Sequence, residues 1–148
     1  MIQDFVHVGI GVFDLEASVR FYTEVLGMQV DYRAQHQGDR ISRVVDVQNA
    51  ELNICVVRKG GMCLELIDYG NAGKKIRQYK DQDSPGLIHL AMKVSDVDGE
   101  YLRLKSMGYP FNSPPMVTRD NGPKICYFRG PDNVVVELYE VLEAPQQR

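Results

Sequence analysis

The chain repeats one pattern of apolar and polar positions, first from His7 and again from His89. In each copy an alternating apolar run is followed by Asp, by apolar residues at helical spacing, and then by Gly. Asp is a favoured N-cap, and Gly is favoured just after a helix ends. The pattern therefore predicts helices within 14–27 and 96–108.

The two copies also close in the same way. Residues 62–69 and 134–141 are short apolar β runs, and each carries a glutamate near its middle, Glu65 or Glu137. Each half of the chain therefore reads strand–helix–strand–strand–strand. This arrangement predicts an α+β fold built from two tandem βαβββ modules.

The length of 148 residues fits one domain, and we expect a single domain over 1–148. Its first module is expected at about 4–69 and its second at 87–142. Residues 70–86 are polar and contain Gly and Pro, which is typical of a linker. The proline-containing stretch 109–123 is expected to form a weak edge strand and a loop over the site.

Strand alternation places the polar residues of these runs on equivalent faces of their strands. Residues two apart on a strand share a face. His7, Glu65, His89 and Glu137 each fall on the face expected to point away from the helix. The residues expected to cover the helices are Val6, Val8, Ile10, Val12, Leu64, Leu66, Ile88, Leu90, Met92, Val94, Val134, Val136 and Leu138.

A carboxylate inside an apolar strand needs a partner, because burying it unpaired costs several kcal/mol or more. If the two sheets curl toward each other, two imidazoles and two carboxylates line one cavity. A divalent metal ion with nitrogen and oxygen ligands would neutralise that charge. The alternative is a His–Glu hydrogen-bond network without an ion.

Three stretches resemble the vicinal oxygen chelate superfamily: "HVGIGVFDLEASVRFYTEVLGMQV" (7–30), "GLIHLAMKVSDVD" (86–98) and "YFRGPDNVVVELYE" (127–140). That family includes glyoxalase I, methylmalonyl-CoA epimerase, extradiol dioxygenases and the fosfomycin- and bleomycin-resistance proteins. The resemblance extends over about 5–142. It implies an open, cup-shaped mixed sheet around a metal site.

The resemblance also implies a ligand set and a reaction. The ligands would be His7, Glu65, His89 and Glu137, around a divalent Ni, Co, Mn, Fe or Zn ion. The chain would be an isomerase or lyase of glyoxalase type, which chelates vicinal oxygens of a small carbonyl substrate and moves a proton through an enediolate-like intermediate. The catalytic residue would be Glu137 or Glu65, and the sequence does not choose between them.

Other members of the family set the alternatives. An extradiol-type Fe(II) dioxygenase would use His7, His89 and Glu137, and would not need Glu65. Methylmalonyl-CoA epimerase has Gln at the place of Glu65, so this chain departs from it. A metabolite- or drug-binding resistance protein would bind its ligand without turnover, and usually lacks these four ligands.

Three further residues are candidates for contacting substrate. Arg43 and Lys124 would hold an acidic group, although such charges are more often solvated at a surface. Tyr127 would lie in the cup, although core packing explains a strand tyrosine equally well.

Composition limits the kinds of binding partner that we expect for this protein. The net charge of −3 is unclustered, which argues against nucleic acid, and no apolar run approaches a membrane span or a signal sequence. Three cysteines in apolar runs are expected to be buried, reduced thiols, as in a cytoplasmic protein. We expect a homodimer acting on a small-molecule substrate.

Overall fold

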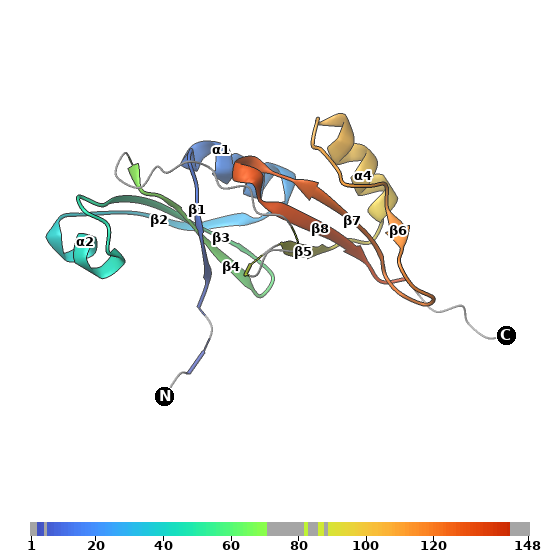
Figure 1. Ribbon diagram of the computed structural model, residues 1–148, viewed down its shortest axis with the longest axis horizontal. Helices are drawn as coiled ribbons and strands as arrows, with labels where there is room; N and C mark the ends of the chain where they lie inside the picture. Colours follow the sequence, from blue (N-terminus) through green and yellow to red (C-terminus); the bar gives the residue numbers. More distant parts are fainter. Residues whose placement is uncertain (1–2, 5, 71–81, 83–85, 88, 143–148) are drawn as a thin grey trace. The chain divides into compact units, whose positions relative to one another are not determined.

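The computed structural model forms two compact units, Met1–Arg77 and Gln78–Arg148. Figure 1 shows the helices and strands of both units. Most of the expected linker 70–86 lies outside the residues that the structure describes. The described residues are 3–4, 6–70, 82, 86–87 and 89–142.

The first unit is a four-stranded mixed sheet with the order β1-β4-β3-β2. Strand β1 runs parallel to β4, and the other neighbours are antiparallel. One helical segment, α1 continued by a π-helical turn η1, separates the first two strands. The elements are β1 (Val8–Gly11), α1 (Leu15–Arg20), η1 (Phe21–Val25), β2 (Gln29–Gln37), α2 (Asp39–Val45), β3 (Glu51–Lys59) and β4 (Met62–Asp68).

The second unit repeats this topology with the order β5-β8-β7-β6, and β5 is again parallel to β8. The weak edge strand expected within 109–123 is β6, which has only two residues. The elements are β5 (Leu90–Lys93), α4 (Val97–Ser106), β6 (Met116–Val117), β7 (Lys124–Arg129), the short 3-10 helix η2 (Pro131–Asn133) and β8 (Val135–Glu140). The α+β fold and both βαβββ repeats are thus confirmed.

The helix boundaries agree with the capping residues. The Asp14 carboxylate accepts a hydrogen bond from the backbone N–H of Ala17 at 2.9 Å, and Asp96 accepts one from Gly99 at 2.9 Å. Gly108 follows the second helix with a φ of 89°. At such a φ a side chain would strain the backbone, so glycine is the suitable residue.

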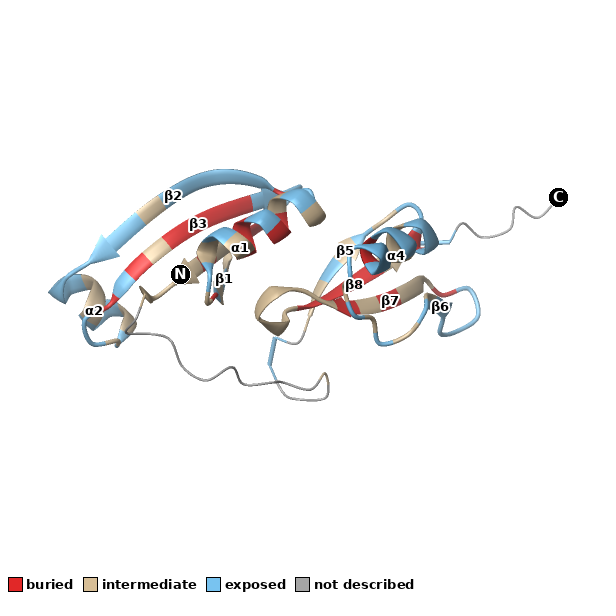
Figure 2. Cartoon of the chain, turned by 90° about the horizontal axis from the view of Figure 1, so that it is seen from above, coloured by how far each residue is buried: buried red, intermediate tan, exposed pale blue. Residues whose placement is uncertain are grey.

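The core of each unit lies mainly between its sheet and its helix. Val12, Leu64, Leu66, Val136 and Leu138 are buried, as alternation predicts. Figure 2 shows buried residues along β3 and β8. The prediction for Val6 is wrong: it precedes the first residue of β1 and is 70% exposed. Ile88 lies outside the described residues.

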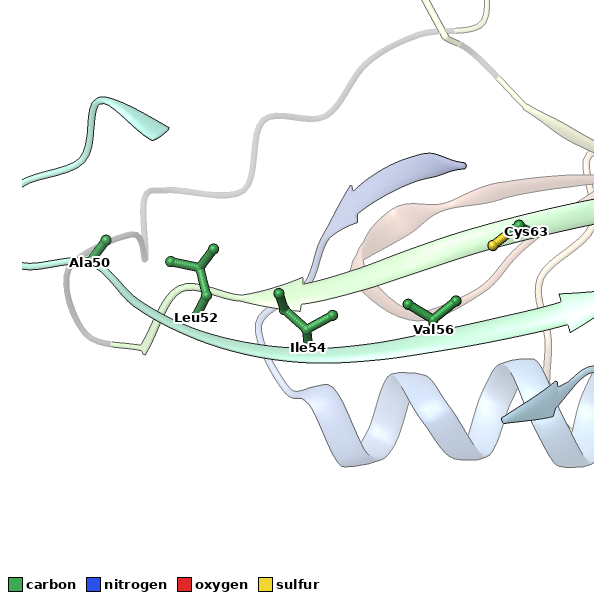
Figure 3. Close-up of a cluster of buried hydrophobic side chains, with 5 residues drawn as sticks. All are labelled: Ala50, Leu52, Ile54, Val56 and Cys63. Carbon is green, nitrogen blue, oxygen red and sulfur yellow. The ribbon is translucent and has the colours of Figure 1, made fainter. Parts of the chain in front are cut away.

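The first unit buries a second apolar cluster that the pattern did not predict. Figure 3 shows this cluster, on the face of β3 and β4 that points away from α1. Partly buried Ile41 and Val45, at or near the ends of α2, pack against it. One pair of apolar residues four positions apart is too short a pattern to predict a helix. The cluster contains Ala50, Leu52, Ile54, Val56 and Cys63.

The three cysteines, Cys55, Cys63 and Cys126, are free and buried, which confirms the expectation for them. Burial raises the pKa of the Cys126 thiol to about 11, so at neutral pH it stays protonated and unreactive. In the part of the chain that the structure describes, no helix is long and apolar enough to span a membrane.

Replacing Asp96 with Ala should lower the free energy of unfolding by about 1 kcal/mol, because the N–H of Gly99 loses its acceptor. Asp14→Ala should have a similar effect in the first unit, and Asp96→Asn should stay within a few tenths of wild type. Urea unfolding followed by circular dichroism measures all three. Equal stabilities for Asp96→Ala and Asp96→Asn would contradict the capping role.

Candidate metal centre

Each unit places one histidine beside one glutamate, starting with His7 and Glu65. Glu65 lies on β4, between β1 and β3, directly opposite Gly9 in the parallel register. His7 is two residues before Gly9, just ahead of the first residue of β1. Its Nε2 atom lies 3.2 Å from Oε2 of Glu65.

The second unit repeats this geometry with His89 and Glu137. Glu137 lies on β8, opposite Ala91 in the parallel register. His89 is two residues before Ala91, and its Nε2 lies 3.2 Å from Oε2 of Glu137. The two halves of the repeated sequence pattern therefore each form a His–Glu pair, with the same Nε2–Oε2 separation in both units.

Tyr127 adds a third group to the second pair. It lies on β7 directly opposite Glu137, and its ring meets the His89 ring edge to face, with the centroids 5.5 Å apart. Burial, together with the hydrogen bond and the negative charge of Glu137, raises the pKa of the Tyr127 phenol. In the first unit the residue opposite Glu65 is Val56, which has no polar atom to offer.

The two pairs also differ in burial. The Glu137 side chain is 10% exposed, whereas that of Glu65 is 18% exposed. Nδ1 of His89 is buried and has no hydrogen-bond partner among the described residues. The second pair is therefore the more enclosed one, and Tyr127 supplies part of the polar surroundings that Glu137 needs.

The turn before β8 sets the register of Glu137. Asp132 and Asn133 adopt positive φ angles of 51° and 64°, and Arg129 donates a hydrogen bond to Oδ1 of Asn133 at 3.2 Å. Asp and Asn tolerate this conformation better than most residues. Gly130, by contrast, is extended with a φ of −95°, so the turn does not rely on its freedom.

The donor atoms of each pair suit a divalent ion. Two ligands about 2.1 Å from an ion and at right angles to each other lie about 3 Å apart. The Nε2–Oε2 separation of 3.2 Å in both units fits that arrangement, and it also fits a plain hydrogen bond. Imidazole nitrogen with carboxylate oxygen suits Mn, Fe, Ni, Co or Zn. Within the described part of either unit, no third His, Cys, Asp or Glu joins the pair to form a metal-binding group.

Two of the three expected substrate residues do not join these pairs. Arg43 is exposed on α2, beside Asp39 and Asp46 at a shallow surface depression. Nζ of Lys124 contacts the Asp98 carboxylate of α4, on the helix side of the sheet. Tyr127 is the expected substrate residue that does lie at a pair, directly opposite Glu137 on an antiparallel neighbour.

Comparison with known proteins agrees with the fold. The model of the Glyoxalase/Bleomycin resistance protein/Dioxygenase superfamily matches residues 4–138. The chain belongs to this superfamily.

Individual relatives span most of the chain. A 2-epi-5-epi-valiolone epimerase from Actinomyces is 34% identical over 140 residues, which cover 89% of this chain and 76% of the relative. A glyoxalase family protein from Bacillus cereus has a TM-score of 0.84 at 22% identity, with 97% of each chain covered. A mutant of the fosfomycin resistance protein FosX from Listeria monocytogenes, solved with Mn(II) and 1S,2S-dihydroxypropylphosphonic acid, has a TM-score of 0.62 at 19% identity, covering 94% of this chain and 90% of the FosX chain.

Substituting Glu137 by Gln should lower the pKa of Tyr127 toward the ordinary tyrosine value, because the charge that opposes phenolate formation is removed. Tyrosine labelled with ¹³C at the ζ carbon, titrated by NMR in EDTA-treated protein, reports this pKa directly. Glu65→Gln is the matched control and should leave it unchanged. A Tyr127 pKa that is equal in wild type and Glu137→Gln would contradict the contact.

Proposed function

We propose that His7, Glu65, His89 and Glu137 together hold one divalent metal ion, and that the protein is a metal-dependent isomerase or lyase of glyoxalase type. The observation that carries this proposal is the duplicated His–Glu pair, with Nε2 and Oε2 3.2 Å apart in each unit. The pairs would share the ion within one chain or between the two chains of a homodimer.

The pairs favour a shared ion on electrostatic grounds. Two ionised glutamates with two neutral imidazoles would give one site a charge of −2, and both glutamate side chains are largely removed from water. Such a site is costly without a cation. FosX, which has the same fold, binds Mn(II), so Mn(II) is the first ion to test, followed by Ni, Co, Fe and Zn.

Such an ion would supply Lewis-acid chemistry: it polarises a carbonyl and stabilises the oxygen that becomes negative when a proton leaves the neighbouring carbon. The residues of this chain would perform the remaining steps. His7 and His89 hold their positions as neutral ligands, and one of the glutamates accepts the proton and returns it. Tyr127 restrains Glu137 by hydrogen bonding.

The substrate that fits this chemistry is a small carbonyl compound with a second oxygen on the adjacent carbon. The most informative relative is an epimerase, and epimerisation beside a carbonyl needs this same removal and return of a proton. We therefore propose proton transfer at the carbon next to a carbonyl, with stereochemical inversion or isomerisation as the outcome. An extradiol dioxygenase remains the alternative within the family.

Metal binding is the first test. Protein purified without chelators should contain one divalent ion per four-residue site, and His7→Ala, Glu65→Gln, His89→Ala and Glu137→Gln should each weaken binding by at least about tenfold. Isothermal titration with Mn(II) measures the affinity. His36→Ala is the matched control, because the third histidine, on β2, belongs to neither pair.

Unchanged affinity in all four variants, or equal loss in His36→Ala, would contradict the shared site. Mixing His7→Ala with His89→Ala chains then distinguishes a site formed within one chain from a site shared between two chains. If the pairs meet across a dimer, heterodimers regain one intact site. If they meet within a chain, every chain stays defective.

Proton transfer is the second test. Metal-loaded protein in D₂O should exchange the hydrogen next to the carbonyl of its substrate, as followed by proton NMR. The panel comprises thiol adducts of 2-oxoaldehydes, α-hydroxyketones including 2-epi-5-epi-valiolone, acyl-CoA esters and catechols. Glu65→Gln and Glu137→Gln should slow the exchange by about a hundredfold or more. Oxygen uptake with catechols and Fe(II), without exchange on any carbonyl compound, would favour the dioxygenase instead.

A further inference from the structure

Two glycines on β1, Gly9 and Gly11, share the strand face of His7, and both are exposed. Neither has a φ in the left-handed region. A Cβ atom built on Gly9 would meet the Cδ1 atom of Ile67 at 3.8 Å, which is ordinary contact, and one built on Gly11 would meet no described atom within 4 Å. The backbone and packing of this unit therefore do not require glycine at either position.

Glycine is nevertheless an unfavourable choice inside a strand, because it has more conformational freedom to lose on folding and no side chain to pack. The second unit shows what the same fold accepts at these places. Opposite Glu137, where the first unit has Gly9, stands Ala91, and Lys93 stands where the first unit has Gly11. The missing side chains are thus a feature of the first unit alone.

Gly9 is the direct neighbour of Glu65 across the parallel register, and Gly11 lies opposite Ile67. Two residues along a strand span about 7 Å. Beside the His7–Glu65 pair there is accordingly a bare strip of backbone about as long as a six-membered carbon ring. Its neighbour on β4 is the apolar side chain of Ile67. Glycine in a strand commonly marks close approach of a ligand.

We propose that Gly9 and Gly11 determine substrate size: the strip that they form receives the uncharged carbon skeleton, a ring or a branched chain, that adjoins the chelating oxygens of the substrate. This inference rests on the proposed function, because the His7–Glu65 pair must belong to the metal site. The acidic Glu65 at one end and Ile67 alongside favour a carbon skeleton over an anionic group.

The first measurement uses metal-free protein. Gly9→Ala and Gly11→Ala should melt at the same temperature as wild type or higher, because alanine restricts the unfolded chain and has room in the folded one. A clear drop in melting temperature for both variants would show that the glycines are structural and would overturn the inference.

The second measurement uses Mn(II)-loaded protein and hydroxamates, which present two neighbouring oxygens to a metal. Isothermal titration should show that wild type accepts both formohydroxamate and the ring-bearing benzohydroxamate. Gly9→Ala and Gly9→Val should bind benzohydroxamate about tenfold or more weakly, because a methyl group without room costs free energy of that order. Formohydroxamate and Mn(II) affinities should change by less than about threefold. Ala91→Gly, in the second unit, is the matched control and should not alter the ratio.

The outcomes separate the two proposals. If wild type binds no Mn(II), the proposed function fails and this inference fails with it. If wild type binds Mn(II) and both hydroxamates, but the Gly9 variants keep the wild-type ratio of the two affinities, the metal site stands and the inference alone is overturned. Parallel loss of both hydroxamates would likewise contradict a size-selective strip.

Discussion

A carboxylate in the central strand of an apolar sheet is the constraint on which this structure depends. Glu137 is 7% exposed and sits between buried valine and leucine positions on β8. The carboxylate is tolerated because His89 lies just before the parallel neighbour β5 and Tyr127 lies on the antiparallel neighbour β7. The order β5-β8-β7 is therefore as necessary to the site as the residues themselves, since it puts an imidazole on one side of the carboxylate and a phenol on the other.

Duplication repeats this constraint in both units. In the first unit Glu65 has the same strand order around it and the same His–Glu separation. The first unit differs because Val56, rather than a tyrosine, lies opposite Glu65, and because Gly9 and Gly11 have no side chains. Two copies of one fold thus place the same pair of side chains in different surroundings. The pair of the second unit is the more enclosed one, and the pair of the first unit is the more exposed one.

The sequence predicted what depends on short-range pattern. Alternation placed His7, Glu65, His89 and Glu137 on the correct faces, and the capping aspartates marked both helix starts. It did not predict α2, whose two apolar contacts are too few for a clear helical period, nor the cluster that α2 covers. Lys124, a candidate for substrate contact, lies beside Asp98, because the parity of β7 turns its side chain to the helix side of the sheet. The role of Tyr127 depended on the exact antiparallel register with β8, which pattern alone does not fix.

X-ray absorption spectroscopy of the Mn(II)-loaded protein tests the central claim most directly, because it counts the imidazole ligands on the ion. Two duplicated His–Glu pairs that share one ion predict two imidazoles per Mn(II), falling to one in either His7→Ala or His89→Ala. A spectrum with no imidazole, or one that neither substitution changes, would show that the pairs are hydrogen-bonded structural elements and that no shared metal centre exists.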